Sequence, residues 1–416
     1  MAGNLLITMS GGTTCVINAT LAGILKAAKK SGRVSRIYAG CPGIQGALKE
    51  SMLDLTDITD SDLELLYYTP ASGFIGTTRI KPLEREQLLL LARVLEAHDI
   101  SYFINIGGNG TIKQSMCISA CLGDAIQIAS VAKTVDNDLG DAAFEKVLYT
   151  PGYPSCANYW RNKVWIMDQE NQGACEHDKV LIAQTFGRKT GFLAACARLA
   201  DLDRQMPLLI LLPEDQQPLS ELMNAIQQTI SKYGRAMVVM SEGYDVGDLG
   251  ERYDLSGQIM YGTSRTTAAQ LLVNNLADIG IQARSFIPAI DQRSDIHFVS
   301  ELDLMRAYQV GFFTVCSLLD GARDFLGSIA RHPYNPEDVD YICVPFAQTQ
   351  NYTRIMPPNW IQAGTFDVSD EYLEYAVPLL GNTCVTLPSE EGQLLFLARP
   401  ETFVKPRLNT AEYALL

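Results

Sequence analysis

The sequence predicts an α/β protein built from two halves, each a parallel sheet covered by helices. Strand-like and helix-like segments alternate along the chain, an order that favours parallel sheets. The length of 416 residues exceeds what one hydrophobic core normally holds, so two or three domains are expected. The alternation also restarts after a break at residues 148–154, where "LYTPGYP" carries two prolines and a glycine.

The first half begins with the short apolar run 4–10, which two glycines separate from the next segment. Residues 84–100 show the apolar spacing of an amphipathic helix, and residues 101–111 read as a strand that runs into glycines. The expected strands cover residues 4–10, 33–40, 101–111 and 125–131, and the expected helices cover 13–32, 84–100 and 111–124.

The second half repeats this order after the break. Its expected strands cover residues 178–187, 207–214, 235–243 and 281–288, and its expected helices cover 158–172, 188–201, 218–234, 263–280 and 302–321. The chain is less regular after about Tyr334, where "HPYNPEDVD" and "TRIMPPNW" read as loops. We expect this tail to wrap back onto the second half.

Composition excludes several classes of function. The net charge is −14, with 33 basic against 47 acidic side chains, which argues against nucleic acid or an anionic membrane surface as a partner. No apolar run approaches the roughly 20 residues of a bilayer span. The N-terminus lacks the charged region of a signal peptide. The ten cysteines and four histidines do not show zinc-ligand spacing, so a reducing, cytoplasmic location is expected.

Polar and glycine-rich motifs recur where the expected strands end. Ligands of open parallel sheets bind beyond the carboxyl ends of the strands, so six such motifs predict one composite site. The motifs are Gly11-Gly12, Gly107–Thr111, the group Thr134, Asp136 and Asp138, Gly187-Arg188, Glu242-Gly243, and Arg284.

The motif "GGNGT" at residues 107–111 ends a strand and opens a helix. Its backbone N–H groups suit a phosphate, but a tight turn that binds nothing explains the glycines equally well. The sequence contains neither GxGxxG nor the lysine pattern of a P-loop, which disfavours the common dinucleotide and nucleotide motifs.

The motif "KTVDND" at residues 133–138 carries a lysine, a threonine and two aspartates beside an apolar strand. A bland loop explains one aspartate but less readily the whole group. One carboxylate can accept a proton from a hydroxyl nucleophile, while the other holds a cation or orients its neighbour. Arginine forks bind phosphate in a bidentate manner, so Arg188, Arg284 and Arg293, with Lys179 and Arg79, form a candidate anion pocket.

These motifs, in this order over residues 4–330, resemble the phosphofructokinase family, which includes ATP-dependent and pyrophosphate-dependent members. The matching segments are "SGGTTCVIN", "GTTR", "GGNGT", "AKTVDNDL", "FGR", Glu242-Gly243 and Arg284 through "IDQR". The length and the tail "DEYLEYAVPLLG" are most similar to the pyrophosphate-type branch of roughly 400 residues. The resemblance implies two Rossmann-like three-layer α/β domains with mainly parallel sheets and the active site in the cleft between them.

The resemblance also implies a role for each motif residue in the 6-phosphofructokinase reaction of glycolysis. Asp136 is the expected base for the 1-hydroxyl of fructose 6-phosphate, within the catalytic group Lys133, Thr134, Asp136 and Asp138. The expected donor-binding residues are Gly11, Arg79, Gly108, Asn109, Gly110 and Thr111. The expected sugar-binding residues are Thr134, Asp136, Lys179, Phe186, Gly187, Arg188, Glu242, Arg284, Ile290, Gln292 and Arg293.

The same resemblance implies Mg²⁺ bridging the donor phosphates, with Asn109 and Asp138 as its candidate protein ligands. It implies a donor-binding domain over residues 1–147 and about 293–345, and a sugar-phosphate domain over residues 148–292 and about 346–416. A homodimer or homotetramer is expected, in which Lys179 serves a neighbouring chain.

Several positions depart from the family pattern. Asn109 stands where many members carry a metal-linked aspartate, Gly110 is typical of ATP users, and Lys133 is typical of pyrophosphate users. The donor is therefore left open, with ATP slightly favoured by Gly110. Departures around the sugar site, namely Lys179, Phe186, Ile290 and Asp291, leave a kinase of another phospho-sugar open. A non-catalytic regulatory paralogue is the other alternative.

Overall fold

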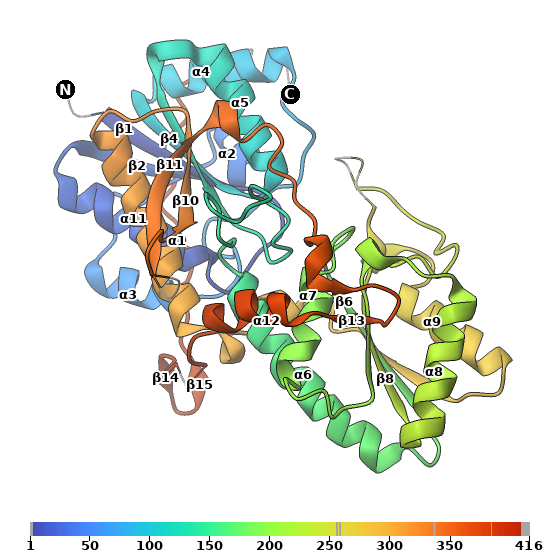
Figure 1. The fold of residues 1–416 in the computed structure, drawn as a ribbon. Coiled ribbons are helices and arrows are strands. Elements are labelled where there is room, and N and C mark those ends of the chain that lie inside the picture. Colours follow the sequence, from blue (N-terminus) through green and yellow to red (C-terminus); the bar gives the residue numbers. More distant parts are fainter. Residues whose placement is uncertain (1–2, 255–256, 258, 336–337, 384, 409–416) are drawn as a thin grey trace.

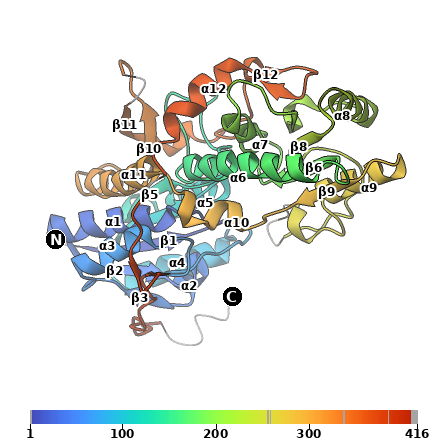
Figure 2. The same ribbon diagram turned by 90° about the horizontal axis from the view of Figure 1, so that it is seen from below.

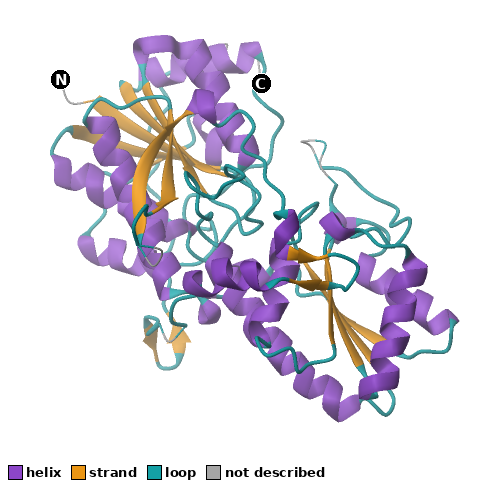
Figure 3. Cartoon of the chain, viewed as in Figure 1, coloured by secondary structure: helices purple, strands orange, loops and turns teal. Residues whose placement is uncertain are grey.

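The computed structural model describes residues 3–408 apart from 255–256, 258, 336–337 and 384. Figure 1 shows two α/β halves, with the sheet of each half lying between helices. Colouring by secondary structure makes the two sheets easy to compare (Figure 3). The predicted α/β class with mainly parallel sheets is confirmed.

A seven-stranded sheet in the order β11-β10-β5-β4-β1-β2-β3 forms the first half. Its central five strands, β10 to β2, are parallel, while β11 and β3 run antiparallel at the two edges. The strands are β1 Gly3–Met9, β2 Val34–Gly40, β3 Met52–Asp54, β4 Ile100–Gly107, β5 Gln127–Ala132, β10 Phe325–Arg331 and β11 Val339–Pro345.

Helices cover both faces of this sheet. One face packs on α1 and α11, and the other on α2, α4 and α5. Two glycines let α1 and α11 approach closely: a Cβ on Gly23 would lie 2.0 Å from the Tyr308 carbonyl oxygen, and one on Gly311 would lie 2.3 Å from that of Thr20. The helices are α1 Ile17–Ser31, α2 Gly43–Leu48, α3 Asp60–Tyr68, α4 Arg85–Ala97, α5 Asn109–Leu122 and α11 Glu301–Leu319.

A four-stranded parallel sheet, β7-β8-β6-β9, forms the second half. Its strands are β6 Val180–Thr185, β7 Leu208–Leu211, β8 Ala236–Ser241 and β9 Ala283–Phe286. The helices α8 Leu219–Tyr233 and α9 Ala268–Asp278 pack on one face, and α6 Tyr153–Ala174 packs on the other, with its apolar side in the core shared with the first half. Figure 2 shows α6 lying between the two sheets.

The helix expected over residues 188–201 is much shorter in the structure. Only α7, Phe192–Ala195, is α-helical, and Cys196–Ala200 continues as a 3₁₀ turn. The Arg198 guanidinium donates to the carbonyl and the carboxylate of Asp201, which closes the chain into this tighter turn.

The tail crosses from one half to the other. Residues 361–376, containing β12 Ile361–Gln362, β13 Asp367–Val368 and α12 Asp370–Ala376, lie near the second half, followed by the hairpin β14 Ser389–Glu390 and β15 Gln393–Leu394. We expected the whole tail on the second half, but residues 397–408 lie on the first. The reason is that β3 is an edge strand with unpaired backbone groups, which the tail satisfies through Asp54 N–H to Thr402 O and Val404 N–H to Met52 O.

Among the described residues, no helix is both long and apolar enough to span a bilayer.

Candidate active site

The candidate site gathers charged groups from both halves of the chain. Electrostatic interactions reach the Asp136 carboxyl from Lys133 and Arg79 of the first half, from Arg188 of the second, and from Arg293 beyond β9. Glu242, which follows β8, interacts with the same Asp136 and Arg188. The loops that follow β5, β6 and β8 therefore meet, as expected for the carboxyl ends of parallel strands.

Backbone geometry sets the direction of the two aspartates. Asn137, between them, has a left-handed φ of 55° and is fully buried. Its side-chain amide donates to the Tyr375 hydroxyl at 2.8 Å. Asp138 accepts a hydrogen bond at 3.1 Å from the amide of Asn109, which opens α5, and the Asp136 N–H donates to Thr134 Oγ1 at 3.2 Å. The buried amide thus anchors the loop that carries both carboxylates.

Burial makes these carboxylates unusually basic. It raises the pKa of Asp136 despite the four nearby cations. Burial and the charge of Asp136 together raise the pKa of Asp138 to about 6. Burial and Asp136 likewise raise the pKa of Glu242 to about 8. A carboxylate with a pKa closer to neutrality is a better proton acceptor for a hydroxyl, which is the property a general base needs.

Lys133 supplies a buried amine beside the aspartates. Its Nζ donates to the carbonyl oxygen of Ser10 at 3.0 Å and also to that of Gly12. Burial, followed by Arg293 and Arg79, lowers the pKa of Lys133 to about 7. Lys133, Arg293 and Arg79 thus lie close enough to repel one another, which is typical of a site that takes up an anion.

The turn at Gly12 is the meeting point of two arginines. A Cβ on Gly12 would lie 3.0 Å from Arg293 Nη1 and 3.3 Å from Arg79 Nη2. The Nε of Arg293 is buried and has no hydrogen-bond partner among the described residues, and the guanidinium carbon lies 5.4 Å from the centre of the Phe186 ring. A buried donor without an acceptor is costly, so an anion that accepts from it would be held firmly.

Glycines bring Arg188 and Glu242 together in the second half. A Cβ on Gly243 would lie 1.6 Å from the Arg188 carbonyl oxygen, so only glycine fits there. Gly187 has a φ of +125°, and its Cβ would lie 2.6 Å from the Thr190 carbonyl oxygen. Close contact of these two turns fixes the positions of both charged side chains.

The glycine-rich turn after β4 is tightly built on one side and open on the other. A Cβ on Gly107 would collide with Thr111, and one on Gly108 would lie 3.7 Å from the Lys133 carbonyl oxygen. The surroundings of Gly110 are open, because none of the described atoms lies within 4 Å of the position of its Cβ. Gly11 has a φ of +80°, and its Cβ would lie 3.6 Å from Lys133 Nζ.

Two predicted anion-binding residues lie away from this group within one chain. Arg284 was expected at the carboxyl end of a strand, but it is the second residue of β9 and is in register with Leu181. Lys179 directly precedes β6, whereas Arg188 follows it, and a six-residue strand spans about 20 Å. Arg284 instead pairs with Asp178 at 2.5 Å.

The remaining predicted sugar-site residues differ in their surroundings. Gln292 is buried and has a structural role, since its Oε1 accepts from the Phe186 N–H at 2.9 Å and from Trp160 Nε1 at 3.1 Å. Ile290 is 64% exposed. Asp291 accepts from the Tyr159 hydroxyl at 2.8 Å, so its carboxylate is already engaged.

Sequence reasoning missed Arg354 and Tyr375, which hold the loop of Asp136 and Asp138 from behind. Arg354 is 3% exposed and donates a hydrogen bond to Asn137. The Tyr375 hydroxyl accepts a hydrogen bond from the Asn137 side chain. Neither residue belongs to a recognisable motif, and Arg354 lies in a proline-rich stretch that reads as a loop.

The oxygen atoms of Asp138 and Asn109 suit a divalent cation that binds together with phosphates. The described residues contain no group of three or more His, Cys, Asp and Glu side chains in a metal-binding arrangement. Asp138 and Asn109 lie side by side, and the raised pKa of Asp138 indicates a carboxylate that a cation would stabilise. One carboxylate, one amide oxygen and substrate phosphates are ligands that Mg²⁺ commonly takes.

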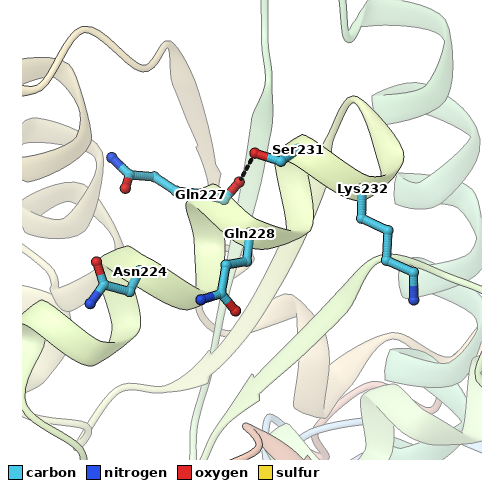
Figure 4. Close-up of a pocket in the computed structure, with 5 residues that line it drawn as sticks. All are labelled: Asn224, Gln227, Gln228, Ser231 and Lys232. Carbon is cyan, nitrogen blue, oxygen red and sulfur yellow. Dashed lines mark hydrogen bonds between the residues drawn. The ribbon is translucent and has the colours of Figure 1, made fainter.

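Two surface hollows of about 550 Å³ each lie outside this group of residues. Side chains of a single helix, α8, line the first, which is drawn in Figure 4: Asn224, Gln227, Gln228, Ser231 and Lys232. The second lies between α2 and the segment after Arg79 and is lined by Gln45, Leu48, Lys49, Ile80, Lys81, Pro82, Glu84, Glu86 and Gln87.

Comparison with known proteins gives consistent matches. A family model described as Phosphofructokinase matches residues 4–317. Pyrophosphate–fructose 6-phosphate 1-phosphotransferase from Halomonas elongata is 30% identical over 393 residues, covering 91% of both chains. ATP-dependent 6-phosphofructokinase 3 from Bacteroides thetaiotaomicron is 28% identical and covers 57% of this chain and 67% of its own. The crystal structure of pyrophosphate-dependent phosphofructokinase from Nitrosospira multiformis superposes with a TM-score of 0.87 at 29% identity, covering 98% of this chain and 99% of its own.

Proposed function

Because this chain belongs to the phosphofructokinase family, we propose that it transfers a phosphoryl group to the 1-hydroxyl of fructose 6-phosphate, giving fructose 1,6-bisphosphate in glycolysis. The observation that carries the proposal is the position of Asp136, a partly buried carboxylate within the field of four cations drawn from both halves. A base that abstracts a proton between a bound phosphate ester and a bound phosphoanhydride needs this combination.

Asp136 is the proposed general base. It accepts the proton of the 1-hydroxyl while the hydroxyl oxygen forms a bond to the transferred phosphorus and the bond from that phosphorus to the leaving phosphate breaks. Lys133 and Thr134 flank this base, and Asp138 supports it from the Asn109 side. Catalysis of phosphoryl transfer depends mostly on positioning and on charge stabilisation, which the surrounding cations supply.

The donor is proposed to lie over the first half, along Gly11, Gly108, Gly110 and Thr111. Arg79 reaches the turn at Gly12, next to the Lys133 amine, so that the donor's phosphates meet two cations. This assigns donor binding to residues 1–147 and about 293–345.

Pyrophosphate is the proposed donor. A relative named for pyrophosphate matches 91% of the chain, whereas relatives named for ATP match 57% and 68%. Lys133 also suits a small dianionic leaving group, because its amine is buried and held by two carbonyls. ATP is the second candidate, and the open space around Gly110, which would accommodate a nucleoside, supports it.

The sugar phosphate is proposed to bind to residues 148–292 and the adjoining part of the tail, with Arg188 and Glu242 as contacts from the two touching turns. The Arg293 guanidinium lies over the ring of Phe186, the residue before Gly187, and would hold the phosphate ester of the sugar. Lys179 and Arg284 are assigned to a neighbouring chain's site in a homodimer or homotetramer. The exposed Arg284 side chain, which the mostly buried Asp178 carboxylate holds in place, supports this assignment.

Mg²⁺ is the proposed divalent cation, with Asp138 and the Asn109 amide oxygen as its protein ligands. When bound, it would neutralise phosphate charge. We place the reaction in the cytoplasm, where sugar phosphates are metabolised.

A direct assay tests the proposed function. The purified chain is incubated with Mg²⁺ and either pyrophosphate or ATP, and with fructose 6-phosphate or a panel of five- and seven-carbon sugar phosphates. Fructose 1,6-bisphosphate formed fastest from pyrophosphate is the expected result. Turnover of another sugar phosphate at a higher kcat/KM, or no turnover with either donor, contradicts the proposal and favours another kinase or a regulatory paralogue respectively.

A further inference from the structure

We propose that Arg354 is a positioning residue: it fixes Asn137 from behind and thereby orients the two aspartates on either side of it. The inference rests on the proposed function, since it takes Asp136 as the base. Arg354 lies beyond residues 4–317, the part that the family model matches, so the tail supplies this contact.

Five hydrogen bonds join Arg354 to the segment from Asn137 to Leu148, and the longest runs from its Nη2 to the Leu148 carbonyl oxygen at 3.5 Å. Its Nε donates to the Asn137 carbonyl oxygen at 2.9 Å, and its Nη2 donates to Asn137 Oδ1 at 2.6 Å. Its Nη1 donates to the Val147 carbonyl oxygen at 2.5 Å, and its own backbone N–H donates to the Asp138 carbonyl oxygen at 2.8 Å. One residue thus holds both ends of the segment that runs from the aspartates to Val147.

Asn137 needs such support because its backbone is left-handed. A non-glycine residue in this conformation is strained, and asparagine tolerates it best when its side chain is hydrogen-bonded locally. The side chain is bonded at both atoms: Oδ1 accepts from Arg354 and from the Thr150 N–H, and Nδ2 donates to the Tyr375 hydroxyl. The side chains of Asp136 and Asp138, on either side of Asn137, then point toward the site, where both interact with Arg188.

The chemistry of Arg354 is unusual for a purely structural residue. The acceptors of its guanidinium in the described structure are all uncharged oxygens, and the group stacks on the Phe144 ring at 4.0 Å. Placing a buried cation without an ion pair is expensive. The cost is accounted for if the planar guanidinium is needed to bind four oxygens of one segment at once, which lysine cannot do.

The test uses Arg354→Met and Arg354→Lys in the full chain. Shifting a base by about 1 Å costs roughly 100-fold in rate, so kcat of Arg354→Met should fall about 10- to 100-fold while KM for either substrate changes less than about twofold. Arg354→Lys should be intermediate. A third variant, Arg354→Ala, leaves space for a free guanidinium ion. Guanidinium chloride at millimolar concentration should restore part of the kcat of this variant, and urea at the same concentration should not.

Arg198→Met is the matched control. Arg198 is also buried and also ties the tail, through Asp367 at 3.0 Å, but it contacts none of the loop of the aspartates. This variant should lower the thermal midpoint and leave kcat of the folded enzyme unchanged. A similar kcat loss in both variants would show that Arg354 stabilises the fold in general and would overturn the inference.

Tyr375→Phe tests whether support of Asn137 positions the aspartates if Arg354→Met does not fold. It removes only a hydroxyl, which accepts from Asn137 and donates to the Leu148 carbonyl oxygen at 2.9 Å. A fall in kcat of about two- to tenfold and faster amide hydrogen exchange over residues 133–150 are expected. Wild-type kcat and wild-type hydrogen exchange in both Tyr375→Phe and Arg354→Lys would overturn the inference. A wild-type chain that is inactive in every assay would instead overturn the proposed function. In that case hydrogen exchange in the variants would still decide the role of Arg354.

Discussion

Replacing Gly243 by alanine would drive a methyl group into the turn that carries Arg188. The added Cβ would lie 1.6 Å from the Arg188 carbonyl oxygen and 2.5 Å from its carbonyl carbon. Close carbon–oxygen contacts are about 3.3 Å, and the Cβ–oxygen distance here would be 1.6 Å, so the turns after β6 and β8 must separate by roughly 1.7 Å.

A displacement of this size has a predictable kinetic effect. Since a misplacement of about 1 Å costs roughly 100-fold, kcat/KM for fructose 6-phosphate should fall about 100-fold or more. KM for the donor should change little, because Lys133 and Arg79 belong to the other half.

The assay varies each substrate in turn while the other is saturating, with fructose 1,6-bisphosphate as the product followed. Gly173→Ala, in α6, is the control: none of the described atoms lies within 4 Å of its Cβ, and alanine favours a helix by about 1 kcal/mol. A folded Gly243→Ala enzyme with wild-type kcat/KM for the sugar phosphate would refute the assignment of Arg188 and Glu242 to the sugar site.

Three further predictions follow from the same geometry. Asp136→Asn should lower kcat by about 10²- to 10⁴-fold with small changes in KM, and equal turnover by the variant would exclude Asp136 as the base. Glu242 has a folded pKa of about 8 against an ordinary 4.5, so its ionisation opposes folding above pH 8 and this penalty fades as pH falls through 8 toward 4.5. Glu242→Gln should therefore raise the thermal midpoint at pH 9 more than at pH 6, and an equal shift at both would contradict the raised pKa. Arg399→Ala removes bonds at 2.8 and 3.2 Å to the carbonyl oxygens of Gly73 and Phe74, just before Arg79. Donor KM should rise about two- to fivefold while sugar KM stays constant, and the reverse pattern would argue against a donor role for Arg79.

Local patterns in the sequence were sufficient to predict most of the fold and the central residues of the site. The β–α alternation predicted both sheets, because parallel strands joined by helices leave a strong periodic signal. The strand-end rule placed Asp136, Arg188 and Glu242 together, although they belong to different strands and lie far apart in the sequence.

The rest depended on register and on contacts without a local signal. Arg284 looked like a strand-end residue, but the pairing of β9 with β6 shifts it to the opposite end, and register is not visible in a single strand's composition. Arg354 and Tyr375 act across more than 200 residues of sequence, with separations of 217 and 238 from Asn137. Their partner is an asparagine whose left-handed backbone no spacing rule predicts.

Arg354 follows Pro345, the last residue of β11, so both main sheets are fully translated before this arginine is made. A ribosome releases the chain from its amino end, and each half is free to collapse while the carboxyl end is still being synthesised. The residues after Pro345 also add buried side chains to the shared core, among them Trp360 and Tyr372. A premature stop codon after Pro345 would therefore leave cells with a polypeptide that lacks part of its core as well as the support of its aspartate loop.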